Sequence, residues 1–155
     1  MISEMSIDLH QETIASERRF KAPSARVSRA FTDPKQREIW SVPDDQTKID
    51  IVEWDIRTGG HEKGLCGTPG AMNWTMLVTY HLVLPDRLIS LTEELWDGDR
   101  LLTVALITFD ISPVGDREAK LILTDQVTSF VDDGATGGHR WGYAKALENL
   151  EKFMA

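Results

Sequence analysis

The chain has 155 residues, of which 41% are hydrophobic and 27% charged, as expected of one globular domain. Its 25 acidic and 17 basic residues give a formal net charge of -8, which argues against nucleic acid as a partner, because a phosphate backbone requires a basic face. No stretch approaches the roughly 18 apolar residues of a membrane span, and the N-terminus is not a secretory signal, so no membrane partner is expected. Cys66 is the only cysteine and cannot form an internal disulfide, which favours a cytoplasmic location.

The N-terminal part of the chain reads as a leader followed by a strand. Residues 1–11 form a polar leader, and a single domain is expected over residues 12–155. In residues 12–23, ETIASERRFKAP, Ile14 and Phe20 share one parity: they are an even number of residues apart, so in a strand both would lie on the same face. Their neighbours are polar, which is typical of a half-buried strand.

The next segment, residues 24–40, predicts two short helices. Ser24 is a possible N-cap of the first helix. Asp33 precedes the second helix, which has Pro34 as its first residue and ends near Trp40.

From residue 47 to residue 128 the pattern predicts antiparallel strands joined by short turns. Glycine, proline and aspartate occupy the turns, and the glycine-rich stretch GGHEKGLCG is assigned to a hairpin rather than to a phosphate-binding loop. The predicted strands are KIDIVEWDIR, NWTMLVTYHLVLP, RLISLTEELW, LLTVALITFDISP and AKLILTDQVTS.

The C-terminal residues 137–155, GGHRWGYAKALENLEKFMA, predict one long amphipathic helix. Tyr143, Leu147 and other apolar residues follow helical spacing and form a broad stripe. Gly142, between two aromatic residues, suggests a close approach of this helix to the sheet. The predicted fold class is therefore α+β: a curved antiparallel sheet of about six to seven strands surrounds a long C-terminal helix, with two short helices after the first strand.

Six segments occur in a characteristic order along the chain: FKAPSARVSRAFTDP with Trp40, DIRTGG, LPDRLISLTEE, ITFDISP, LILTDQV and GHRWGYAKALENLEKF. In this order they resemble the START-like, Bet v 1-like (SRPBCC) superfamily. Within it, the chain resembles the family of the C-terminal domain of the heat-shock-protein-90 ATPase activator, although it has Tyr143 where the family commonly has Trp, and His61 where the family commonly has an aromatic or basic residue after the paired glycines. The resemblance implies the helix-grip fold with a pocket between sheet and helix, but it transfers no catalytic signature.

Two acids interrupt apolar parities and are the candidate catalytic residues. Glu93 shares a parity with Leu91 in one strand, and Asp125 shares a parity with Leu123 in another. Both could face one cavity, where burial and mutual repulsion would raise the pKa of at least one carboxyl. The alternatives are a slipped register or pairing of the acids with Arg18 or Arg87.

The pocket wall is predicted from the strand NWTMLVTYHL, whose aromatic and aliphatic residues share a parity; ordinary core packing is the alternative. No metal site is expected, because the HExxH pattern that begins at His61 and Glu62 fails at Leu65. No cofactor is expected either. The predicted ligand-binding residues are Trp74, Met76, Val78, Tyr80, Glu93, Asp125, Tyr143 and Leu147.

Three function classes remain open. Binding of a small, largely apolar ligand in a cavity between the sheet and the C-terminal helix is preferred. The first alternative is an enzyme, such as a cyclase, hydrolase or lyase, that uses a pocket carboxylate as general acid or base. The other is a chaperone-linked interaction module, less favoured because the additional N-terminal domain of the full activator is not expected here. The strand LLTVALITFDI is apolar on both faces, which predicts a possible homodimer.

Overall fold

The structure, a computed structural model, describes residues 6–42 and 44–155 and confirms the α+β helix-grip fold. Within these residues one strand precedes two short helices, six strands follow, and a long helix ends the chain. The elements are β1 (His10–Phe20), α1 (Ser24–Thr32), α2 (Pro34–Trp40), β2 (Lys48–Trp54), β3 (His61–Thr68), β4 (Ala71–Leu84), β5 (Leu88–Asp97), β6 (Arg100–Val114), β7 (Glu118–Ser129) and α3 (Asp133–Met154).

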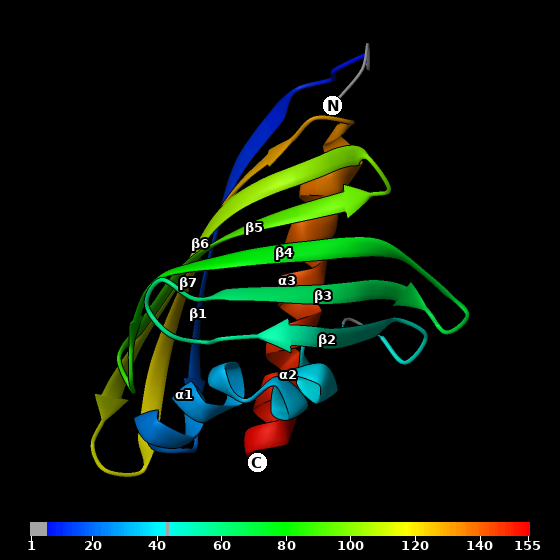
Figure 1. Cartoon of the computed structure of the whole chain (residues 1–155). Helices are drawn as coiled ribbons and strands as arrows, with labels where there is room; N and C mark the ends of the chain where they lie inside the picture. Colours follow the sequence, from blue (N-terminus) through cyan, green and yellow to red (C-terminus); the bar gives the residue numbers. More distant parts are fainter. Residues whose placement is uncertain (1–5, 43) are drawn as a thin grey trace.

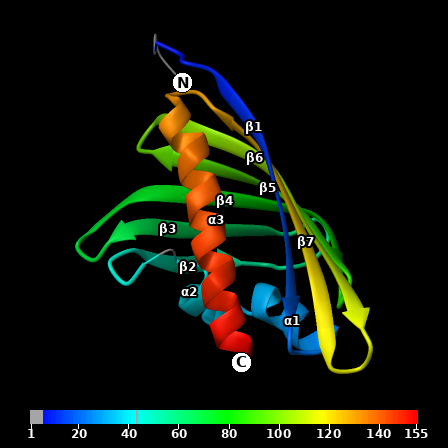
Figure 2. The ribbon, with the colours of Figure 1, turned by 180° about the vertical axis from the view of Figure 1, so that it is seen from behind.

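The strands form a single seven-stranded antiparallel sheet in the order β1-β7-β6-β5-β4-β3-β2. The sheet is strongly curved, and α3 runs across its concave side, while α1 and α2 lie near the C-terminal end of α3 (Figures 1 and 2). Asn149 on α3 donates a hydrogen bond to the carbonyl oxygen of Val42, which fixes the segment after α2 against the long helix.

The core lies between the concave face of the sheet and the helices. Strand alternation places Leu121, Leu123 and Val127 of β7 on this face, and each is at most 1% exposed. Leu147 and Leu150 of α3 are equally buried. These side chains are fully buried between the sheet and α3.

Three local expectations are corrected. The stretch GGHEKGLCG is not only a hairpin, because β3 begins at His61 and pairs with both β2 and β4. Ser24 is the first residue of α1 rather than its N-cap. Helix α3 begins at Asp133, before the predicted start, because Asp132 accepts a hydrogen bond from the backbone of Ala135 at 3.0 Å.

The remaining expectations concern the N-terminal leader, a membrane span and a homodimer. Strand β1 already begins at His10, within the predicted leader, and residues 1–5 of that leader lie outside the described residues. No helix in the described part of the chain has the length and apolar character required to cross a bilayer. On the convex face of β6, Leu106 is 40% exposed. The homodimer stays a prediction.

Candidate functional site

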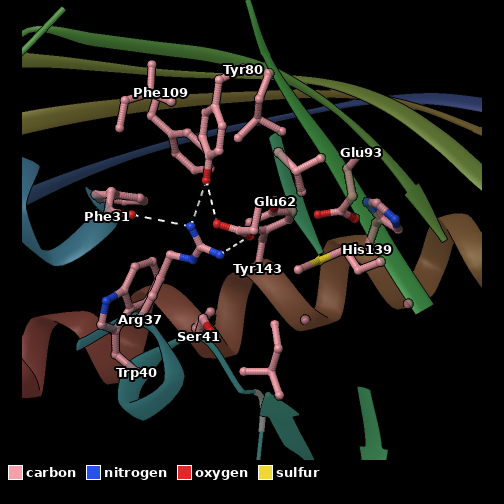
Figure 3. A pocket seen from close by; sticks show the side chains of 18 residues that line it. Phe31, Arg37, Trp40, Ser41, Glu62, Tyr80, Glu93, Phe109, His139 and Tyr143 are labelled. Carbon is pink, nitrogen blue, oxygen red and sulfur yellow. Dashed lines mark hydrogen bonds and ion pairs between the residues drawn. The ribbon is translucent and has the colours of Figure 1, made fainter. Parts of the chain in front are cut away.

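A cavity of about 210 Å³ lies between the concave face of the sheet, α2 and α3. Its walls are mostly apolar, and aromatic side chains from α1, α2, β4, β6 and α3 surround it (Figure 3). The lining residues are Phe31, Arg37, Trp40, Ser41, Ile49, Glu62, Met76, Val78, Tyr80, Ile89, Leu91, Glu93, Phe109, Gly138, His139, Gly142, Tyr143 and Ala146.

One polar cluster in this cavity consists of Arg37, Glu62 and Tyr80. The guanidinium of Arg37 forms a hydrogen-bonded ion pair with Glu62 and donates to the Tyr80 hydroxyl at 2.9 Å. Tyr80 in turn donates to the other carboxylate oxygen of Glu62 at 2.8 Å, which closes a triangle (Figure 3). Glu62 is fully buried and Arg37 nearly so, so this is a buried ion pair with its hydrogen bonds satisfied.

Two local features aim these side chains inward. On α2, Pro34, Arg37 and Trp40 recur every three residues, and this face of the helix is turned toward the cavity. Before β3, the chain turns sharply at Gly60, where an added Cβ would meet the Asp55 carbonyl oxygen at 1.9 Å, so only glycine fits. The turn starts β3 in the register that pairs Glu62 with Val78, on the inner face.

The partners determine how these groups titrate. Burial opposes the charge of Arg37, but the negative charge of Glu62 and the hydrogen bonds to Glu62 and Tyr80 outweigh it, and the pKa of Arg37 is raised. Burial raises the pKa of Tyr80 above its ordinary value. Arg37 is therefore a permanent cation and Tyr80 a neutral hydroxyl at any physiological pH.

A second polar cluster consists of Asp125, His139 and Glu93. His139 Nδ1 lies 2.7 Å from Asp125 Oδ2, and since an ionised carboxylate only accepts, the ring donates from Nδ1. Asp125 is completely buried, and its Oδ1 has no hydrogen-bond partner among the described residues. The Glu93 carboxylate lies beside the His139 ring (Figure 3).

These groups shift one another's pKa values. Burial raises the pKa of Glu93; His139 opposes this shift and Asp125 adds to it. Burial opposes the charged form of His139, but the hydrogen bond to Asp125 and the charges of Glu93 and Asp125 dominate, so the pKa of His139 is raised. Burial and the same two acids raise the pKa of Tyr143, which is therefore a neutral hydroxyl.

The long helix contributes open space rather than close packing. Gly138 and Gly142 both line the cavity, and a Cβ added at either position would have no atom within 4 Å. The expected close approach of the helix to the sheet at Gly142 is therefore wrong. Because glycine has no side chain, the cavity extends to the backbone of α3 at these two positions.

The structure places the predicted site residues in three kinds of position. Met76, Val78, Tyr80, Glu93 and Tyr143 line the cavity. Asp125 and Leu147 are buried behind it and are not among the lining residues. Trp74 is 43% exposed and lies opposite Asp97, near the end of its strand and away from the cavity lining.

The structure does not pair Glu93 or Asp125 with Arg18 or Arg87, the alternative left open by the sequence. Arg18 lies 3.4 Å from Glu151, and Arg87 pairs with Asp110. Neither arginine contacts Glu93 or Asp125, which face the concave side as strand parity requires.

The sequence pattern did not identify three of the site residues, Arg37, Glu62 and His139. His139 had a usable signal, because it lies four residues before Tyr143 and so extends the helical stripe. Arg37 shares the three-residue spacing of Pro34 and Trp40. In the described part of the chain no group of three or more His, Cys, Asp or Glu side chains could hold a metal ion.

The environment of Glu93 gives a first prediction. Because its folded-state pKa is raised, the ionised form is disfavoured, and the native state loses stability as pH rises above the unfolded value of about 4.3 and through the folded pKa. Glu93→Gln removes that charge at nearly constant shape. We expect the variant to be at least as stable as wild type at pH 7, with its relative stability increasing from pH 4 to pH 8 in urea unfolding.

Glu94→Gln is the matched control. Glu94 is next in sequence but on the other face of β5, where it accepts a hydrogen bond from the Trp96 indole at 3.1 Å. Its substitution should leave the pH dependence of stability unchanged. Equal pH profiles for the two variants would show that Glu93 is an ordinary solvated acid.

Comparisons with known proteins identify the family and the fold of the chain. A family model described as Activator of Hsp90 ATPase homolog 1-like protein matches residues 21–155. No curated protein sequence matches the chain.

Solved structures extend the likeness over nearly the whole chain. An uncharacterised protein from Rhizobium leguminosarum is 28% identical, with 95% of this chain and 96% of that chain covered and a TM-score of 0.76. A protein from Rhizobium loti is 25% identical, with 94% and 98% covered and a TM-score of 0.73. CalU16 from Micromonospora echinospora is 19% identical, with 96% and 85% covered and a TM-score of 0.64, which shows the shared fold alone. The chain belongs to the family of Activator of Hsp90 ATPase homolog 1-like proteins, within the START-like (SRPBCC) superfamily.

Proposed function

We propose that this protein binds a small, largely apolar molecule in the cavity between the sheet and α3, in the cytoplasm. The observation that carries this proposal is the composition of the cavity wall: aromatic and aliphatic side chains around two fixed polar clusters. Binding sites for small molecules combine such apolar walls with a few oriented polar groups. The family fold, which is commonly used for ligand binding, supports the proposal.

The volume limits the ligand. The cavity of about 210 Å³ exceeds the roughly 150 Å³ that accommodates benzene in an engineered site. It is smaller than the about 300 Å³ at which pockets for drug-sized ligands begin. The ligand that fits is a single ring with a short substituent, or an aliphatic molecule of similar size.

The polar groups favour a ligand with one hydrogen-bonding function. The guanidinium of Arg37 is already bonded to Glu62, Tyr80 and the carbonyl oxygen of Phe31, so it offers little free capacity. The Glu93 carboxyl lines the cavity beside His139 (Figure 3). An oxygen or nitrogen on the ligand would therefore bind beside Glu93 and His139.

Filling the cavity from the helix tests the proposal. Gly142→Leu places a branched side chain in open space that belongs to the cavity. The probes are a series of three ketones, acetone, cyclohexanone and phenylacetone, each titrated separately by isothermal titration calorimetry. We expect Gly142→Leu to bind phenylacetone at least tenfold more weakly than wild type, a loss of about 1.4 kcal/mol in binding free energy.

Gly137→Leu is the control, since Gly137 lies on the same helix with open space around it but does not line the cavity. Both variants replace a helical glycine and gain similar helix propensity. Gly137→Leu should bind like wild type. If no compound of the series binds wild type, or if Gly142→Leu binds as wild type does, the proposed site is wrong.

A further inference from the structure

We propose that Asp125, His139 and Glu93 form an acid–base centre that moves a proton at the carbon next to a carbonyl group of a small apolar ligand. This inference rests on the proposed function, because the ligand must first enter the cavity. It assigns a reaction class, proton abstraction and return at an activated C–H bond, to one end of that cavity. His139 is the base, Glu93 is the acid, and Asp125 positions His139.

The geometry around His139 supports its role. Asp125 holds Nδ1 at 2.7 Å, which fixes the ring orientation and leaves Nε2 as the nitrogen available to a ligand. His139 itself lines the cavity, while Asp125 is completely buried behind it. A carboxylate that orients an imidazole and stabilises its protonated form is the arrangement that general bases use in many unrelated folds.

Glu93, on β5, is the third residue of the centre and lies across the cavity from α3. It reaches the cavity from β5, beside the His139 ring that comes from α3 (Figure 3). Burial raises the pKa of its carboxyl, which favours the protonated form that can donate to a carbonyl oxygen. The groups that act on this carboxyl are His139 and Asp125, with Arg37 and Glu62 of the other cluster farther along the cavity.

Covalent catalysis is less well supported, because neither Cys66 nor Ser41 is an activated nucleophile. Cys66 is not among the lining residues, and the pKa of its thiol is raised to about 12, so it is not a nucleophile at neutral pH. Ser41 lines the cavity, but its hydroxyl has no hydrogen-bond partner among the described residues and therefore no activating base.

The proton transfer balances without another reactant. His139 Nε2 takes the proton from the α-carbon, the electrons of the C–H bond form the new C=C bond, and the carbonyl π electrons move to oxygen, which takes the Glu93 proton. Return of a proton from the imidazolium to carbon, and of the enol proton to Glu93, restores both residues. In D₂O the imidazolium proton exchanges with a solvent deuteron before it returns to carbon, so the same cycle replaces hydrogen by deuterium at the α-carbon.

The test follows deuterium incorporation into acetone, cyclohexanone and phenylacetone in D₂O by NMR, with the full chain at constant pD. General acid–base catalysis contributes roughly 10²–10⁴-fold in rate. We expect wild type to exchange at least one ketone about 100-fold faster than His139→Gln, with Glu93→Gln also reduced at least tenfold. His81→Gln, at an exposed histidine that contacts Thr92 on the opposite face, should exchange like wild type.

The role of Asp125 is tested by a pH profile. Asp125→Asn should move the half-maximal exchange rate to lower pH, because the negative charge that favours the imidazolium is lost. A titration of the His139 ring by NMR provides the same readout without substrate. Thermal unfolding shows which variants are folded. Gly142→Leu should also lose exchange, because it fills the cavity, although Asp125, His139 and Glu93 are all present.

The outcomes separate this inference from the proposed function. If a ketone binds in the calorimeter but wild type exchanges it no faster than His139→Gln, the acid–base centre is overturned and the binding site stands. If no ketone binds, the binding site fails and this inference fails with it. An unchanged pH profile in Asp125→Asn overturns the positioning role of Asp125.

Discussion

Replacing Arg37 by methionine is expected to lower the free energy of unfolding by about 3–5 kcal/mol, the usual effect of removing one partner of a buried ion pair. The variant leaves the carboxylate of Glu62, whose side chain is 0% exposed, without its cation. It also removes a donor to the Tyr80 hydroxyl. The measurement is urea unfolding at pH 7, followed by tryptophan fluorescence.

Two further variants make this result specific. Arg57→Met removes an arginine whose pair with Asp55 is exposed, so its stability should stay close to that of wild type. Adding Glu62→Leu to Arg37→Met removes the orphaned charge and should recover much of the lost stability. A single Arg37→Met variant as stable as wild type would show that the two side chains are not paired in solution.

The thiol of Cys66 is expected to react with iodoacetamide on the order of a thousandfold more slowly than free cysteine at pH 8. Burial is the main cause that raises the pKa of this thiol to about 12. Only about one thiol in 10,000 is then ionised, against roughly a quarter of free cysteine with a pKa of about 8.5, and the thiolate is the reactive form.

Unfolded protein is the control for this measurement. In concentrated urea the same thiol should react at the rate of free cysteine, and the protection should return on refolding. Mass spectrometry at timed intervals distinguishes the two states. Rapid labelling of the folded protein would mean that Cys66 is solvated, contrary to its partly buried place against the core.

The amino-acid sequence alone predicted every strand except β3, and the faces on which their side chains lie. In LISLTEELW and LILTDQV, side chains alternate with a period of two, so the buried Leu91 and Leu123 fix Glu93 and Asp125 on the same concave face. The long helix followed from the spacing of Tyr143, Leu147 and later residues. Such patterns are local, and burial of one face is enough to determine them.

The sequence was less informative where glycine is frequent. Glycine lowers helix propensity, and this hid the first turn of α3, which Asp132 caps. The glycines around His61 likewise hid β3, a strand held by pairing on both sides. In β3 the pairing with β2 and β4 outweighs the local preference, and this strand contains Glu62, a residue of the site.

Only the tertiary structure decided which polar groups meet. Arg37, Glu62 and Tyr80 come from α2, β3 and β4, and His139 reaches Asp125 from a different element. Parity also placed Trp74 with Met76, yet Trp74 is exposed because its side chain lies beyond the cavity lining. A periodic pattern identifies the buried face of one element, whereas the partner across the cavity depends on sheet curvature and on the position of α3, which arise only when all the elements pack together.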